Sequence, residues 1–140
     1  MTLVPTVNTN GGATVSFDLK LTPGQTGRTD AIISSTSTEY SGVALIYDNG
    51  QIYFQVWFPS QCYEAPISFT VDANFHNFAF KVDPSGNAEW IRDGIVEMEQ
   101  PSFPTTLIMN LELETFTSSS PGPTIPVGDA WVDNVEITSP

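Results

Sequence analysis

The chain has 140 residues, which is enough for one domain with a single two-layer core. Hydrophobic residues make up 40% of it and aromatic residues 11%, and this composition excludes a disordered chain. The formal net charge of −12 argues against nucleic acid and anionic membrane surfaces as partners, because 4 basic residues cannot neutralise an array of phosphates. No apolar run approaches the roughly 18 residues of a membrane helix, so no membrane insertion is expected.

The sequence predicts strands along its whole length, because short runs of alternating polar and apolar residues are separated by turn signals. The clearest runs are ATVSFDLKL (13–21), GVALIY (42–47), QIYFQVWF (51–58), FHNFAFKV (75–82) and AEWI (88–91). One face of most runs is apolar, as in two antiparallel sheets stacked face to face. We therefore expect an all-β fold, a two-sheet antiparallel β-sandwich of the jelly-roll type.

The expected domain is the whole chain, residues 1–140, with an N-terminal arm over residues 1–12 and a long loop over residues 115–129. The loop sequence TFTSSSPGPTIPVGD is of low complexity, and a strand pattern resumes after it, so it is expected to be an excursion from the domain rather than a linker. The single cysteine, Cys62, excludes an intrachain disulfide and is expected to be buried or half-buried.

The run QIYFQVWF has a second face that calls for an explanation. Side chains alternate along a strand, so one face carries the apolar set Ile52, Phe54, Val56 and Phe58. The other face carries Tyr53, Gln55 and Trp57, with the two rings about 13 Å apart along the strand. Flat rings beside polar groups suit the sugars of an extended glycan, which makes these three residues candidate ligand-binding residues. The alternative is that both rings pack beneath a loop, since Trp is usually largely buried.

Two further tryptophans need an assignment. Strict alternation places Trp131 on one face with Asp133, Val135 and Ile137, so we expect Trp131 in the core. Trp90 shares a face with Arg92 ahead of the RDG turn, where it can serve either the core or a ligand. We include Trp90 and Arg92 among the candidate ligand-binding residues.

Three segments, VSFDLKLT, NFAFKVDPSGNAEWIRDG and AWVDNVEIT, occur in an order that resembles the concanavalin A-like jelly-roll superfamily of laminin-G-like domains, lectins and glucanases. The matching residues are Phe17 and Asp18, then Asp83, Gly86, Trp90, Asp93 and Gly94, then Asp133, Asn134 and Val135. The pattern departs from the family at Phe75 and His76, where a Trp is frequent. The resemblance implies glycan binding or adhesion, as in most members, while a minority are glycosidases or lyases.

The resemblance also implies a calcium site, because such lectins often hold Ca²⁺ at a strand edge through carboxylate and backbone oxygens. Asp133 matches the family's ligand position, and Asp18, Asp30 and Asp129 are candidate neighbours. A hard cation needs six or more oxygens, so aspartates that cap turns are the alternative interpretation.

The segment NLELE places Glu112 and Glu114 on one face of a strand and resembles the ExDxE strand of jelly-roll glucanases. Carboxyl groups two residues apart can reach the separation of about 5–5.5 Å that a retaining pair needs. Asn110 occupies the position of the nucleophile, however, and an amide cannot take that role. We therefore expect that the chain is not an enzyme, with Glu112 and Glu114 as the catalytic candidates if it is one. The only histidine, His76, lies on the apolar side of its strand, so neither a nucleophilic triad nor a zinc site is expected.

The leading hypothesis is a non-catalytic, lectin-like module that binds a glycan or polysaccharide through the aromatic strand, with calcium as a candidate cofactor. The alternative is a structural or display protein, such as an adhesin subunit or a virion decoration protein, that meets protein neighbours or copies of itself through an interface. A jelly-roll glycoside hydrolase is the third hypothesis. The start of the chain lacks the regions of a signal peptide, so the expected location, extracellular or on a particle surface, implies an excised module or a virion component.

Overall fold

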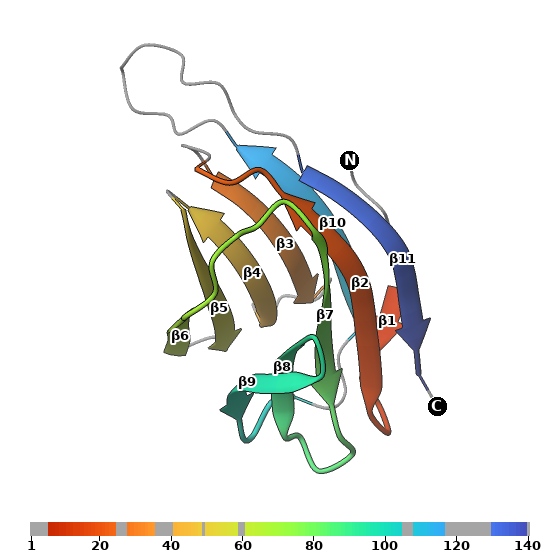
Figure 1. Cartoon of the computed structure of the whole chain (residues 1–140). Coiled ribbons are helices and arrows are strands. Elements are labelled where there is room, and N and C mark those ends of the chain that lie inside the picture. The colour runs from red at the N-terminus through yellow and green to blue at the C-terminus, as the bar shows by residue number, and fades with distance from the viewer. Residues whose placement is uncertain are drawn as a thin grey trace.

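The computed structural model describes residues 6–24, 28–35, 41–48, 50–58, 61–104, 108–116 and 130–139, with the backbone alone for residues 6–7, 28–35 and 108–116. The described residues form eleven strands and no helix, arranged as two antiparallel sheets (Figure 1). Within this part of the chain there is accordingly no helix that could cross a bilayer.

Sheet A has six strands, in the spatial order β1 (Thr6–Asn8), β10 (Ile108–Phe116), β3 (Arg28–Ser35), β4 (Gly42–Asp48), β5 (Gln51–Phe58) and β6 (Gln61–Ile67). Sheet B has five, in the order β11 (Ala130–Thr138), β2 (Ala13–Leu21), β7 (Phe75–Val82), β8 (Ala88–Arg92) and β9 (Ile95–Gln100). Strands β11, β2 and β7 lie side by side in one layer, with β10, β3 and β4 in the layer behind (Figure 1).

The core lies between the sheets and is built from the apolar faces that the alternation predicts. It includes Val15, Phe17, Leu19 and Leu21 from β2, Ile52, Phe54 and Val56 from β5, and Phe78, Phe80 and Val82 from β7. Burying each of these side chains stabilises the fold by about 1.5–3 kcal/mol before the cost of ordering it.

Trp90 joins the two sheets at the centre of this core. Its ring stacks on Phe54 of the opposite sheet with centroids 4.9 Å apart and an interplanar angle of 7°. The indole N–H also donates a hydrogen bond to the backbone oxygen of Gln55 at 3.3 Å. Trp90 is 1% exposed, so its assignment to the ligand-binding residues is wrong.

Strand β11 contains a bulge that corrects a second assignment. The register with β2 shifts between Asp133 and Glu136, and Asn134 adopts φ 49°. The extra residue changes the side to which the following residues point, so Val135 and Ile137 pack on the core. Trp131, on the other side of the bulge, lies on the outer surface of sheet B and is 43% exposed. The expectation that Trp131 belongs to the core is therefore wrong, because it assumed unbroken alternation.

The remaining differences concern strands β3 and β6, which were not among the predicted runs, and the ends of other elements. The segment Gln61–Ile67, in which no strand was expected, forms edge strand β6, where Pro66 does no harm to the sheet. Cys62 lies on this edge and is exposed rather than buried. Part of the predicted N-terminal arm is strand β1, and strand β10 continues to Phe116, past the predicted start of the long loop. Residues 1–5 and 117–129 lie outside the described residues.

Candidate functional site

Strand β5 places Tyr53, Gln55 and Trp57 on the outer face of sheet A, opposite the core. All three are half-buried, whereas Ile52, Phe54 and Val56 between them are at most 1% exposed. The two aromatic side chains are therefore neither core residues nor freely projecting ones. A strand can bind a ligand through its aromatic rings only if these rings are not fully buried, and Tyr53 and Trp57 meet this requirement.

The neighbouring strands set the chemistry around these rings. Gln55 pairs with Ala44 of β4 on one side and with Glu64 of β6 on the other, and its amide nitrogen donates a hydrogen bond to the Glu64 carboxylate. Ala44 and Ile46 are 2% and 4% exposed although they lie on the outer face, so the outer face of β4 is covered. Trp57 pairs with Gly42, which has no side chain, and with Cys62 of β6; its indole nitrogen is buried although the side chain as a whole is half-buried. The face thus presents two rings with a hydrogen-bonded amide and carboxylate between them.

The backbone register also aligns residues of β5 with residues of β10, through β4 and β3 of sheet A. The position of Glu112 aligns with Gln55 through Ile32 and Ala44. In the same way the position of Glu114 aligns with Tyr53, and that of Asn110 with Trp57. The sheet therefore brings the positions of the candidate carboxylates and the aromatic strand onto one surface, about 14 Å apart across three strand spacings.

Arg92 does not belong to this surface. Its Nη2 and Nε atoms donate to the Glu97 carboxylate at 2.6 and 2.9 Å, and Nη1 donates to Asp93 at 3.3 Å. Its guanidinium carbon lies 4.7 Å from the centre of the Phe69 ring. These contacts hold Arg92 at one end of sheet B, so the expectation that it binds the same ligand as β5 is wrong.

The two candidate calcium ligands are adjacent on the outer face of sheet B. The register pairs Asp133 with Asp18, and both carboxylate oxygens of Asp18 accept amide hydrogen bonds, from Asn77 at 2.9 Å and Asn134 at 2.6 Å. The bonds from Asn134 and Asn77 lower the pKa of Asp18, so the carboxylate is charged at neutral pH. Among the described side chains, no group of three or more His, Cys, Asp or Glu is arranged to hold a metal ion. A calcium ion at Asp133 stays a prediction.

His76 links two carboxylates at the start of β7. Its Nδ1 lies 2.7 Å from Asp93 and its Nε2 lies 3.0 Å from Asp72. Burial works to lower the pKa of His76, but the hydrogen bonds to Asp93 and Asp72 outweigh it and the pKa is raised. The hydrogen bond from His76, together with those from Asn74, holds the pKa of Asp72 far below its usual range. This cluster ties the segment after β6 to sheet B and carries no open reactive group.

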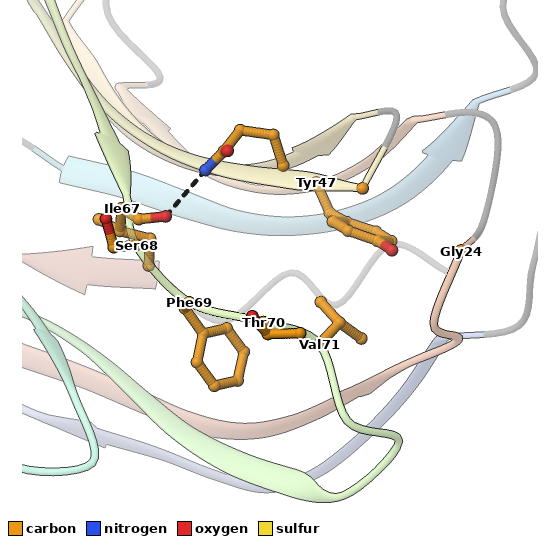
Figure 2. A pocket seen from close by; sticks show the side chains of 9 residues that line it. Gly24, Tyr47, Ile67, Ser68, Phe69, Thr70 and Val71 are labelled. Carbon is orange, nitrogen blue, oxygen red and sulfur yellow. Dashed lines mark hydrogen bonds between the residues drawn. The ribbon is translucent and has the colours of Figure 1, made fainter.

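A pocket of about 500 Å³ opens at one end of the sandwich, between the β4–β5 hairpin and residues 67–71 (Figure 2). Its polar side chains hold its walls together: Gln51 donates to the backbone oxygen of Ile67 at 2.8 Å, and Tyr47 donates to that of Thr22 at 3.2 Å. None of the described residues that line it is acidic or basic. The pocket therefore offers space but no catalytic group.

Comparison with known proteins identifies the fold. No protein-family model and no curated protein sequence matches the chain. Among solved structures, an alginate lyase from Pseudomonas aeruginosa is similar over 94% of this chain and 66% of its own, at 16% identity and a TM-score of 0.67. Bacillus licheniformis beta-glucanase is similar over 93% and 67%, at 15% identity and a TM-score of 0.63. Sheep galectin-11 is similar over 98% and 97%, at 9% identity and a TM-score of 0.63. The chain spans about two thirds of the length of the lyase and the glucanase.

These neighbours overturn the expectation that the chain is not an enzyme. That expectation rested on the amide at Asn110, which argues against one hydrolytic mechanism only. Alginate lyases and a beta-glucanase share this architecture, so the fold does not exclude catalysis. In its two antiparallel sheets, their strand order and the proteins it resembles, this chain has the concanavalin A-like jelly-roll fold.

Proposed function

We propose that the protein binds a polysaccharide across the outer face of sheet A. The observation that carries the proposal is the division of β5, in which Tyr53 and Trp57 are only half-buried while the alternate residues fill the core. The rings can stack on sugar faces, and Gln55 with Glu64 can meet the hydroxyl groups between them. The named activities of the alginate lyase and the beta-glucanase, both directed at polysaccharides, support a ligand of this class.

The charge distribution favours a neutral polysaccharide over an anionic one such as alginate. Strands β4, β5 and β6 contain no basic residue; Lys20, Lys81 and Arg92 belong to sheet B, and Arg28, at the start of β3, is the one basic residue in the strands of sheet A. The net charge of −12 repels a polymer of uronic acids at long range. A neutral polymer of this kind is met outside the cell, so an extracellular or particle-surface location is part of the proposal.

Cleavage of the bound polysaccharide is the second candidate function. The backbone register favours it, because it aligns the positions of Glu112 and Glu114 with Gln55 and Tyr53, about 14 Å away across β3 and β4. Either carboxyl group can then act as the acid or base of a hydrolysis. Asn110 cannot act as the nucleophile, so such a hydrolase would use an attacking water.

The binding proposal is tested by electrophoresis of the native protein through gels that contain a neutral polymer (galactomannan, xyloglucan or mixed-linkage β-glucan) or the anionic polymer alginate. We expect at least one of these neutral polymers to retard the protein, and Trp57→Ala to weaken the binding about tenfold, the loss of one stacked ring. The control is Tyr63→Ala, because Tyr63 is an exposed aromatic residue that lies on the other side of β6. An equal loss in both variants, or retardation by alginate alone, contradicts the proposal.

The same polymers are assayed for new reducing ends with the wild type, Glu112→Gln and Glu114→Gln. If the wild type releases reducing ends, and one Gln variant loses this release but is retarded as strongly as the wild type, the protein also cleaves the polysaccharide. Retardation without release confines the proposal to binding. If no polymer retards the protein, and the wild type self-associates in a way that Trp57→Ala disrupts, the outer face of sheet A is a protein interface instead.

A further inference from the structure

The outer face of sheet B carries an aromatic row that strict alternation hides. Trp131 of β11, Lys20 of β2 and Phe75 of β7 are consecutive cross-strand partners. Trp131 is 43% exposed and Phe75 is 49% exposed. The ammonium nitrogen of Lys20 lies 4.6 Å from the centre of the Trp131 ring and 5.9 Å from that of Phe75. Two accessible rings thus flank one cation, which they attract through their π faces.

A polar row lies directly beside this aromatic row. Two residues further along the same strands, Asp133, Asp18 and Asn77 are again cross-strand partners. The amides of Asn77 and Asn134 fix the Asp18 carboxylate between them, at 2.9 and 2.6 Å. Asp133 accepts a hydrogen bond from the backbone N–H of Asn134 at 2.8 Å and is itself exposed. The carboxylates are therefore held in place with lone pairs that remain for other donors.

We propose that these two rows, the β11–β2–β7 patch, form a second glycan-binding site, independent of the β5 face and on the opposite side of the sandwich. Its ligand is a neutral sugar residue that stacks on Trp131 or Phe75. The sugar's hydroxyl groups donate to the carboxylates of Asp18 and Asp133 and accept from the Lys20 ammonium.

The dimensions and the charge of the patch select this ligand. Three strands and two residues span about 10 Å by 7 Å, which matches one or two sugar rings and is far below the area of about 800 Å² per partner that a specific protein interface buries. A cation between the rings and carboxylates beside them make a poor apolar centre for a protein contact. Asp18, Asp133 and the exposed Glu136 also disfavour an anionic sugar.

The test uses the full chain in gels with the same neutral polymers, now with Trp131→Ala alone and combined with Trp57→Ala. We expect the Trp57→Ala protein to keep part of its retardation and the double variant to lose it. Trp131→Ala alone should weaken retardation about tenfold for a polymer that uses this patch. The matched control is Ile95→Ser, because Ile95 is 55% exposed on β9 of the same sheet, outside the patch.

The outcomes separate this inference from the proposal for the β5 face. If Trp131→Ala is no longer retarded while Trp57→Ala is retarded as strongly as the wild type, the β11–β2–β7 patch is supported and the β5 proposal is contradicted. If Trp57→Ala is no longer retarded and Trp131→Ala is retarded as strongly as the wild type, the β5 proposal is supported and the patch is contradicted. Equal loss in Ile95→Ser, or a dimer of the wild type that Trp131→Ala dissociates, overturns the patch as a glycan site.

Discussion

His76 has both ring nitrogens engaged by carboxylates, which only the imidazolium form can satisfy with two donors. The ring also packs edge-on against Phe69, with centroids 4.6 Å apart, and Phe69 lines the pocket at the end of the sandwich. The charged groups around it are Asp72 and Asp93, with Arg92 bound to Asp93 and Glu97. Protonation of one side chain therefore supports the segment that connects the two sheets.

The raised pKa of His76 predicts a loss of stability as the pH rises. The folded state binds the proton more tightly than the unfolded state, so the contribution is complete below the unfolded pKa of about 6.5 and disappears as the pH passes the folded pKa. The melting temperature of the wild type should fall more between pH 6 and pH 8.5 than that of His76→Gln, which lacks the titrating group. Melting curves of both proteins across this range measure the difference.

The lowered pKa values of Asp72 and Asp93 act at the other end of the pH scale: their contribution to stability is complete above the unfolded pKa of about 3.9 and is lost as the pH falls from there toward the folded pKa values. Parallel curves for wild type and His76→Gln above pH 6 contradict this account. His76 is the only histidine, so no second imidazole can obscure the result.

The bulge in β11 decides which side chains of that strand meet the core. Asn134 takes a left-handed conformation, with φ 49°, that Asn tolerates better than most residues. Its amide also donates to Asp18 on the neighbouring strand at 2.6 Å. Backbone conformation and side-chain bonding thus favour Asn at this position together.

Two substitutions of Asn134 separate these contributions. Asn134→Gly removes the amide but accepts the positive φ, and should change the free energy of unfolding by at most about 1 kcal/mol. Asn134→Val removes the amide and adds a branched side chain in a strained conformation, and should cost about 1–2 kcal/mol more than the Gly variant. Urea unfolding followed by circular dichroism measures both. Equal stability of the two variants rules out the strained conformation as the cause.

Strands β2, β5 and β7 could be predicted to the residue, because strong alternation coincides with turn signals at both ends. Edge strand β6 could not, because an exposed edge needs no apolar face and QCYEAPI shows none. The exposure of Trp131 could not be predicted from alternation for a different reason. The extra residue of the β11 bulge puts Trp131 on the opposite face of the strand from Val135 and Ile137. The Asn in VDNVE, a residue that tolerates positive φ, was the available signal.

The two sheets depend on each other through Trp90. Its ring stacks on Phe54, and its N–H reaches the backbone of Gln55, whose side chain lies on the proposed polysaccharide face. The core therefore fixes the strand that carries Tyr53 and Trp57 from behind. The sequence predicts a single core but cannot say which strands face each other across it, so this contact had no sequence signal.

Removing the ring should destabilise the protein strongly. Trp90→Ala deletes a fully buried ring and is expected to lower the free energy of unfolding by about 3–5 kcal/mol. Trp90→Phe keeps an aromatic partner for Phe54 and should retain part of that stability. Urea unfolding gives both values, and a cost below about 1 kcal/mol for Trp90→Ala contradicts a central role for the stack.

The composition of the proposed face was only partly open to prediction. Alternation alone brings Tyr53, Gln55 and Trp57 together, since they belong to one strand. The partners Glu64 and Ala44, and the alignment with Glu112, come from strand order, which alternation does not encode. The same holds for Lys20 between Trp131 and Phe75, three residues from strands far apart in the sequence.

The distribution of tryptophans gives the protein three built-in optical reporters. Trp90 is 1% exposed, Trp57 is half-buried on one outer face, and Trp131 is 43% exposed on the other. The three indoles therefore fluoresce in environments of different polarity. A neutral quencher such as acrylamide should quench Trp131 most efficiently and Trp90 least. A ligand bound on either side of the sandwich protects a different emitter, so fluorescence alone can tell which surface is occupied without any added label.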